Sequence, residues 1–203
     1  RFSSCLAVFK DVYVSPCFGI SDGDKMYGFW YIPSLDWNYI CGWNYRVTKQ
    51  FDEVITFGHF NMFIFGHFFF DLLVPLMMVP EDVLHRATII YKNYGDYPHE
   101  VFQMLGIRSD QVVLFNEMGW VSAHIVYTLV PAPHISFFGK PMKDLSYKLK
   151  RAANVSDTIE PTGYYLMNRK TNRCFTKEAM TEILNYLKLN YKGYTWEIYE
   201  DSA

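Results

Sequence analysis

The chain has 203 residues, of which 50% are hydrophobic and 20% are charged, and its formal net charge is −2. This composition excludes a disordered chain, a collagen, a coiled coil and a small disulfide-stapled protein. With 19 basic against 21 acidic side chains and no long basic run, we expect no nucleic-acid partner held by phosphate neutralisation. The length predicts one domain, or one domain and part of a second.

Residues 1–56 are predicted to form a β-rich N-terminal segment. Leu6–Phe9 and Val12–Val14 are rich in strand-forming residues, and a turn signal at Ser21–Asp24 precedes a third strand-like run, Met26–Tyr31. This order is typical of an antiparallel meander with a polar tip. The tip also spells the Asp-x-Asp pattern with which some sugar transferases hold a metal ion. Because Asp and Gly are favoured in hairpin turns for backbone reasons, we interpret it as a turn.

The four cysteines, Cys5, Cys17, Cys41 and Cys174, are widely spaced and include no Cys-x-x-Cys pair. A structural zinc site therefore has little support. Three of the four lie within the first 41 residues, and whether any of these three form a disulfide stays open.

Phe57–Val79 is the most apolar stretch of the chain, and its length would permit a membrane span. However, it contains His67 and Asp71, and a carboxylate near the centre of a bilayer costs about 2.5–3.5 kcal/mol on insertion scales. Glycines also divide the run. We therefore predict a buried helix of a soluble domain, with a membrane-embedded protein as the alternative.

Strands and helices alternate from here on, which predicts the parallel layers of an α/β fold. We assign residues 57–154 to one α/β domain on this basis. The helix that begins near Pro98 should end at Gly106, because glycine is the usual residue after a helix C-terminus. The expected strands are Ala87–Tyr91, Val112–Phe115 and Ala123–Val130, and the expected helices are Pro98–Gly106 and Met142–Ala153.

A polar stretch, Val155–Thr162, reads as a linker to a second strand–helix–strand unit. Its expected strands are Tyr164–Met167 and Trp196–Tyr199, and Thr176 is a good N-cap for the helix between them. One such unit is too small to be a domain. We therefore expect residues 155–203 to be the start of a second α/β domain, which the chain leaves incomplete.

His67 and Asp71 form the first candidate site. They are four residues apart, so they share one face of a helix and can approach each other. A carboxylate beside an imidazole fixes its tautomer and raises its basicity, which suits a general base. The same pair could be an internal hydrogen bond that satisfies two buried polar groups, and the residues alone favour this interpretation.

The second candidate site is the basic loop Asn168–Arg173 between a strand and a helix. Ligands of open α/β sheets lie beyond the carboxyl ends of strands and beside helix N-termini. Arg169 and Arg173 could hold a pyrophosphate there, because guanidinium groups match phosphate oxygens. The loop could also be an ordinary charged surface loop, and the residues alone leave both interpretations open.

Three blocks of the chain, taken in order, resemble glycosyltransferase family 61, which includes plant xylan-decorating transferases and animal O-linked GlcNAc transferases. Phe65–Leu76 is similar to the family's aromatic-His and acid-x-Leu-Pro block. Val101–Val113 resembles its Leu-Gly-Ile segment and the strand that follows. Tyr165–Glu178 resembles its strand with Ser-Arg, a further Arg pair and Asn-Glu. The departures are Leu76 in place of Arg, Asn168 in place of Ser and Cys174 in place of the second Arg.

The resemblance implies a GT-B arrangement of two Rossmann-like domains and an inverting transfer from a nucleotide sugar such as UDP-GlcNAc or UDP-xylose. The acceptor would be a hydroxyl of a glycan or glycoprotein, and the enzyme a hexosyl- or pentosyltransferase without a cofactor or metal. By the same resemblance, His67 and Asp71 would be catalytic. The substrate-binding residues would be Asn168, Arg169, Arg173 and Glu178.

The resemblance also implies the lumen of the Golgi or endoplasmic reticulum, within the secretory pathway. There Asn154, in the sequon Asn154-Val155-Ser156, would be a glycosylation site. We expect any membrane anchor to lie outside this chain. The alternative function is a non-catalytic sugar- or nucleotide-binding relative, or an inactive fragment.

Overall fold

The structure is a computed structural model in which the chain divides into two compact units, Arg1–Asn154 and Val155–Ala203. Each unit is described by itself. The residues that the structure describes are 5–27, 46–57, 62, 64–92, 95–115, 119–130, 139–156, 158, 160, 163–168 and 174–200.

The first unit is built on a seven-stranded mixed sheet with the order β3-β2-β1-β7-β4-β5-β6. Strands β7, β4, β5 and β6 are mutually parallel, whereas β1 runs antiparallel to β7 and continues into an antiparallel meander with β2 and β3. The strands are β1 (Cys5–Val14), β2 (Ile20–Ser21), β3 (Met26–Tyr27), β4 (Val47–Ile55), β5 (Thr88–Tyr91), β6 (Val112–Leu114) and β7 (Trp120–Val130).

The parallel strands follow the order that begins a Rossmann sheet. Taken from the first parallel strand, β4, the chain adds β5 and β6 on one side and then returns to place β7 on the other side. The sheet therefore has a topological switch point between β4 and β7. The predicted α/β class is confirmed. The predicted β-rich segment 1–56 contributes β1 and β4 to this sheet, where they are the two neighbours of β7.

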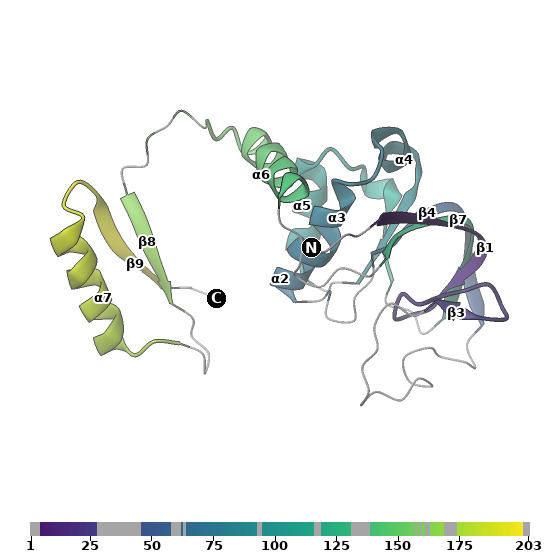
Figure 1. The fold of residues 1–203 in the computed structure, drawn as a ribbon, viewed down its shortest axis with the longest axis horizontal. Helices are drawn as coiled ribbons and strands as arrows, with labels where there is room; N and C mark the ends of the chain where they lie inside the picture. Colours follow the sequence, from purple (N-terminus) through teal and green to yellow (C-terminus); the bar gives the residue numbers. More distant parts are fainter. Residues whose placement is uncertain are drawn as a thin grey trace. The chain divides into compact units, whose positions relative to one another are not determined.

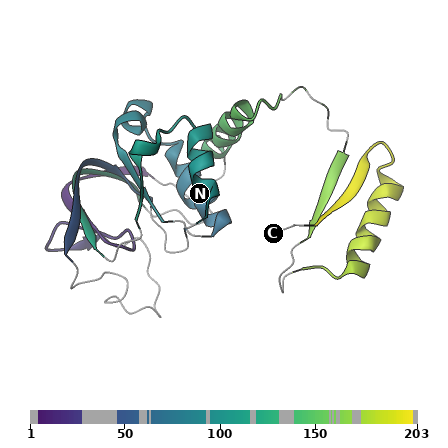
Figure 2. The ribbon, with the colours of Figure 1, turned by 180° about the vertical axis from the view of Figure 1, so that it is seen from behind.

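Helices gather beside the sheet of the first unit, while β1, β7 and β4 curve strongly (Figure 1 and Figure 2). The predicted stop at Gly106 is confirmed. Gly106 has a φ of 75°, its amide donates to the carbonyl of Gln103, and the amide of Ile107 donates to that of Phe102. The helical elements are α2 (Phe65–His67), η1 (Phe68–Leu73), α3 (Val74–Leu76), α4 (Glu81–Arg86), α5 (Tyr97–Met104), η2 (Ser109–Gln111) and α6 (Lys140–Ala152).

One helical segment, formed by α2, η1 and α3 in succession, lies in the core. Phe68, Leu72 and Leu73 are fully buried, and the ring of Phe68 lies 5.6 Å from that of Phe102 and 6.4 Å from that of Tyr91. The prediction of a buried helix is thus confirmed for residues 68–76, whereas Phe65 at the start of the segment is exposed. Within the described part of the chain, no helix is long and apolar enough to cross a membrane.

An ion-pair network ties helix α4 to the strands at the switch point. The Nε of Arg86 donates to both carboxylate oxygens of Glu53 on β4, at 2.9 and 3.0 Å. The hydroxyl of Tyr127 on β7 donates to Glu53 at 2.9 Å. The hydrogen bond from Arg86 holds the pKa of Glu53 below its usual range.

The second unit is a single strand–helix–strand element. Strands β8 (Gly163–Asn168) and β9 (Thr195–Glu200) are parallel, and helix α7 (Lys177–Asn190) joins them. The predicted N-cap is confirmed, because the hydroxyl of Thr176 accepts a hydrogen bond from the amide of Ala179 at 3.2 Å.

Replacing Phe68 tests the core around the helical segment. Phe68→Ala should lower the free energy of unfolding by about 3–5 kcal/mol, because it leaves a cavity among packed rings. Phe65→Ala removes the same ring from a residue that is 61% exposed and should cost far less. Urea denaturation of both variants measures the difference, and equal losses would contradict the described packing.

Replacing Glu53 tests the network at the switch point. Glu53→Gln should cost about 1.5–3 kcal/mol at pH 7, the range for hydrogen bonds to charged groups. The folded-state pKa of Glu53 is lowered, so its contribution is present above the unfolded-state pKa and disappears as pH falls through the folded-state value. Urea denaturation across this pH range should therefore show the variant and the unmodified chain converging in acid.

Glu81→Gln provides the control for this measurement, because its side chain is 80% exposed. It should change stability little at any pH. A loss in Glu53→Gln that stayed constant from neutral to acidic pH would rule out the ionic contribution.

Candidate functional site

His67 and Asp71 meet in the helical segment that follows β4. The Nδ1 of His67 lies 2.6 Å from Oδ2 of Asp71. The side chain of Asp71 is fully buried, and that of His67 is 12% exposed. The predicted approach of the two side chains is therefore confirmed, in a place where a lone carboxylate would be unfavourable.

The local backbone explains how the pair is held. His67 is the last residue of α2, and Asp71 lies in η1, a π-helical turn with Phe68, Leu72 and Leu73 buried around it. Turns of this kind are rare and occur often at functional sites. A carboxylate that accepts a hydrogen bond from Nδ1–H leaves the imidazole lone pair on Nε2. This arrangement can take a proton from a hydroxyl that approaches Nε2.

The pair belongs to the first crossover from the switch point. Helical segment 65–76 follows β4 in the chain, and the switch point lies between the carboxyl ends of β4 and β7. Thr56 stands at that edge and was missed by the sequence analysis. Its amide donates to the carbonyl of Tyr127 at 3.0 Å, while its buried hydroxyl has no hydrogen-bond partner among the described residues.

An apolar hollow of about 440 Å³ lies between this helical segment and α6. Its surface is almost free of polar groups, so it suits hydrocarbon and not the hydroxyls of a sugar. The residues that line it are Phe65, Gly66, Phe69, Phe70, Val74, Met142, Leu145, Ser146, Leu149 and Lys150.

In the second unit, Asn168 joins the two ends of the predicted basic loop. Its Nδ2 donates to the carbonyl of Phe175 at 2.9 Å, and the amide of Phe175 donates to its Oδ1 at 3.0 Å. Asn168 therefore braces the loop, and its predicted contact with a substrate stays a prediction. Arg169 and Arg173 lie outside the described residues.

Glu178 lies in the first turn of α7, where negative charge is favourable. Hydrogen bonds from its own backbone amide and from the side chain of Thr176 lower the pKa of its carboxyl. Glu178 thus stabilises the N-terminus of α7, and its role in binding substrate stays a prediction. Asn154 is exposed after the end of α6, and its glycosylation also stays a prediction.

The Asp22-Gly23-Asp24 motif is a turn, as predicted. Oδ1 of Asp22 accepts hydrogen bonds from the amides of Asp24 and Lys25, and Oδ2 accepts one from the hydroxyl of Tyr27. These bonds lower the pKa of Asp22. Over the described ranges, no group of three or more His, Cys, Asp or Glu side chains could hold a metal ion.

The described cysteines carry free thiols. Cys5 and Cys174 are exposed, and burial raises the pKa of the Cys17 thiol. Cys41, the remaining partner considered for a disulfide, lies outside the described residues.

Comparison of the chain with known proteins gives a family match that covers the three sequence blocks, including those that contain His67, Asp71 and Asn168. No curated protein matches the chain. The sequence profile described as Glycosyltransferase 61 matches residues 65–203, a range that includes His67, Asp71 and the whole of the second unit. This match covers more than half of the sequence, and the chain therefore belongs to glycosyltransferase family 61.

Proposed function

We propose that this protein transfers a hexosyl or pentosyl group from a nucleotide sugar, such as UDP-GlcNAc or UDP-xylose, to a hydroxyl of a glycan or glycoprotein. The observation that carries the proposal is the buried His67–Asp71 pair in the first crossover after the switch point. Membership of the family supports transfer of a sugar between a donor and an acceptor.

The proposed reaction is a single displacement with inversion. Nε2 of His67 takes the proton of the acceptor hydroxyl as its oxygen attacks the anomeric carbon of the donor. The bond from that carbon to the diphosphate breaks, and its electron pair leaves on the diphosphate oxygen. Asp71 stabilises the imidazolium that forms, because its carboxylate already lies 2.6 Å from Nδ1.

The departing diphosphate needs positive charge close to its oxygens. We assign this role to Arg169 and Arg173, which follow β8 and precede α7, and we propose that no metal ion is needed. The two hydrogen bonds between Asn168 and Phe175 support this assignment, because they join the residues on either side of the segment that contains the two arginines. Glu178 would help to orient the nucleotide sugar.

The remaining parts of the proposal concern the whole protein. We propose a GT-B arrangement with an anchor outside this chain and a place in the Golgi or endoplasmic reticulum lumen. A non-catalytic relative that binds sugar or nucleotide is the second candidate. It is favoured by Asn168 and Cys174, which stand where the resemblance calls for Ser and Arg. Release of UDP from a UDP-sugar in the presence of acceptor separates an enzyme from a binding protein.

Removing the two loop arginines tests donor binding. Arg169→Ala/Arg173→Ala should weaken UDP binding roughly 10–100-fold, because charge-assisted hydrogen bonds to phosphate are lost. Isothermal titration with UDP measures the effect. Lys188→Ala/Lys192→Ala removes two exposed cations, one from the last turn of α7 and one from the turn that follows it, and should leave UDP affinity unchanged. Equal affinity in both double variants would overturn the assignment of the loop.

Replacing the paired residues tests catalysis. His67→Ala and Asp71→Asn should each lower the transfer rate by about 10²–10⁴, the usual contribution of a positioned general base, with little change in UDP affinity. Gly66→Ala is the matched control in the same segment, because the added carbon has no atom within 4 Å apart from its chain neighbours and the backbone of its own helix. Melting curves show which variants remain folded. A folded His67→Ala variant with full activity would refute the proposed base.

A further inference from the structure

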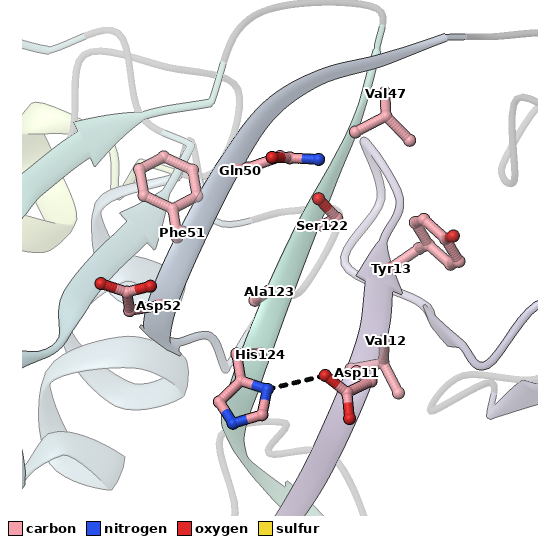
Figure 3. Close-up of a pocket in the computed structure, with 10 residues that line it drawn as sticks. All are labelled: Asp11, Val12, Tyr13, Val47, Gln50, Phe51, Asp52, Ser122, Ala123 and His124. Atoms are coloured by element: carbon pink, nitrogen blue, oxygen red, sulfur yellow. Dashed lines mark hydrogen bonds and ion pairs between the residues drawn. The ribbon is translucent and has the colours of Figure 1, made fainter.

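A polar groove of about 540 Å³ lies on the face of the sheet formed by β1, β7 and β4 (Figure 3). It has no counterpart in the sequence analysis, because its residues come from three strands that are distant in the chain. Figure 3 shows the residues that line it, which are Asp11, Val12, Tyr13, Val47, Gln50, Phe51, Asp52, Ser122, Ala123 and His124.

The register of the strands arranges the polar side chains in two rows. Ser122 on β7 is paired with Tyr13 on one side and with Gln50 on the other, which gives the first row. The second row is two residues further along β7, where His124 stands between Asp11 on β1 and Asp52 on β4. Neighbouring strands are about 5 Å apart and alternate residues about 7 Å, so the rows form a small lattice of hydrogen-bonding groups.

The second row contains an unusual backbone. Asp11 has a φ of 53°, in the left-handed region, and it stands where the pairing of β1 with β7 skips a residue. Its Oδ1 lies 2.7 Å from Nδ1 of His124. The two side chains are 75% and 64% exposed, and an ion pair this exposed adds little stability. The fold alone thus gives little reason for this arrangement.

The chemistry of the groove selects the kind of ligand. The groove contains two carboxylates and one imidazole, and none of its ten lining residues is Lys or Arg. This charge disfavours phosphate, a nucleotide or an anionic glycan. Carboxylate and amide oxygens accept hydrogen bonds from hydroxyl groups, Gln50 can also donate, and the ring of Tyr13 can lie against the apolar face of a sugar.

We propose that this groove binds a neutral oligosaccharide, and that it is an acceptor-binding subsite of the proposed glycosyltransferase. This inference rests on the proposed function. The groove lies along the first half of β4 and β7, whereas His67 follows the carboxyl end of β4. From Ala123 to the end of β7 the strand extends about 20 Å, so the acceptor is a chain of several sugars and not a monosaccharide.

Titration of the full 203-residue chain with xylohexaose, mannohexaose and chitohexaose tests the proposal. We expect at least one of these probes to bind, and its monosaccharide to bind at least tenfold more weakly. Gln50→Ala/Asp52→Ala should weaken binding about tenfold or more, because one hydrogen bond to a charged group is already worth that factor. Absence of binding by all three hexasaccharides would overturn the proposal.

Asp11→Gly gives a second, independent variant. Glycine adopts a φ of 53° without strain, so the variant removes the carboxylate and keeps the backbone path. It should weaken oligosaccharide binding while the melting temperature changes little. Glu182→Ala, which removes an exposed carboxylate from α7, is the matched control and should bind normally. If the folded Gln50→Ala/Asp52→Ala and Asp11→Gly variants both bind the oligosaccharide with unchanged affinity, the oligosaccharide binds elsewhere and the groove proposal is refuted.

The same variants separate this inference from the proposed function. All groove variants should bind UDP as the unmodified chain does. If UDP binding depends on the arginine loop but no hexasaccharide binds, the groove proposal is wrong and the transferase proposal stands. If a hexasaccharide binds in the groove but no UDP is released from a UDP-sugar, the groove stands as a saccharide site and the transferase proposal fails.

Discussion

The central constraint of the first unit is that β7 pairs along both of its edges. One edge takes β1 in antiparallel register, and the other takes β4 in parallel register. The parallel edge creates the switch point from which the segment bearing His67 departs. The antiparallel edge brings the N-terminal strand into the same sheet and aligns the two rows of the groove. A shift of one residue in the register of β1 would turn its polar face toward the core, where Val12 and Val14 are now buried, so burial fixes the alignment of β1 with β7.

The buried carboxylate of Asp71 imposes a second constraint. An isolated charge in an apolar interior is costly, and here an imidazole four residues earlier lies within hydrogen-bond distance of it. The π-helical turn that contains Asp71 is surrounded by phenylalanine and leucine, which hold the backbone while the polar pair keeps its geometry. The network of Arg86, Glu53 and Tyr127 adds an anchor between α4 and the two strands at the switch point. Apolar packing around Asp71 and ion pairs at Glu53 therefore stabilise the same part of the first unit, the segments that follow β4.

The elements with strong local signals could be predicted from the sequence. Gly106 as a helix stop and Thr176 as an N-cap depend on residues within one turn, and both were confirmed. Strand β4 was missed, because Lys49, Gln50 and Asp52 interrupt its apolar pattern and most of its residues are exposed. The spacing of His67 and Asp71 predicted their approach, whereas the burial of Asp71 depends on distant packing. The pairing of Asp11 with His124 joins residues 113 positions apart and has no local signal.

The hydrogen bonds between Asn168 and Phe175 affect how tightly the basic loop can bind a ligand. Two hydrogen bonds between Asn168 and Phe175 bring the ends of the intervening segment together when the unit folds. Much of the conformational entropy that closing this loop costs is therefore lost during folding, before a ligand binds. A partner that contacts the loop meets a segment whose ends are already fixed, and preorganisation of this kind favours affinity without adding a contact.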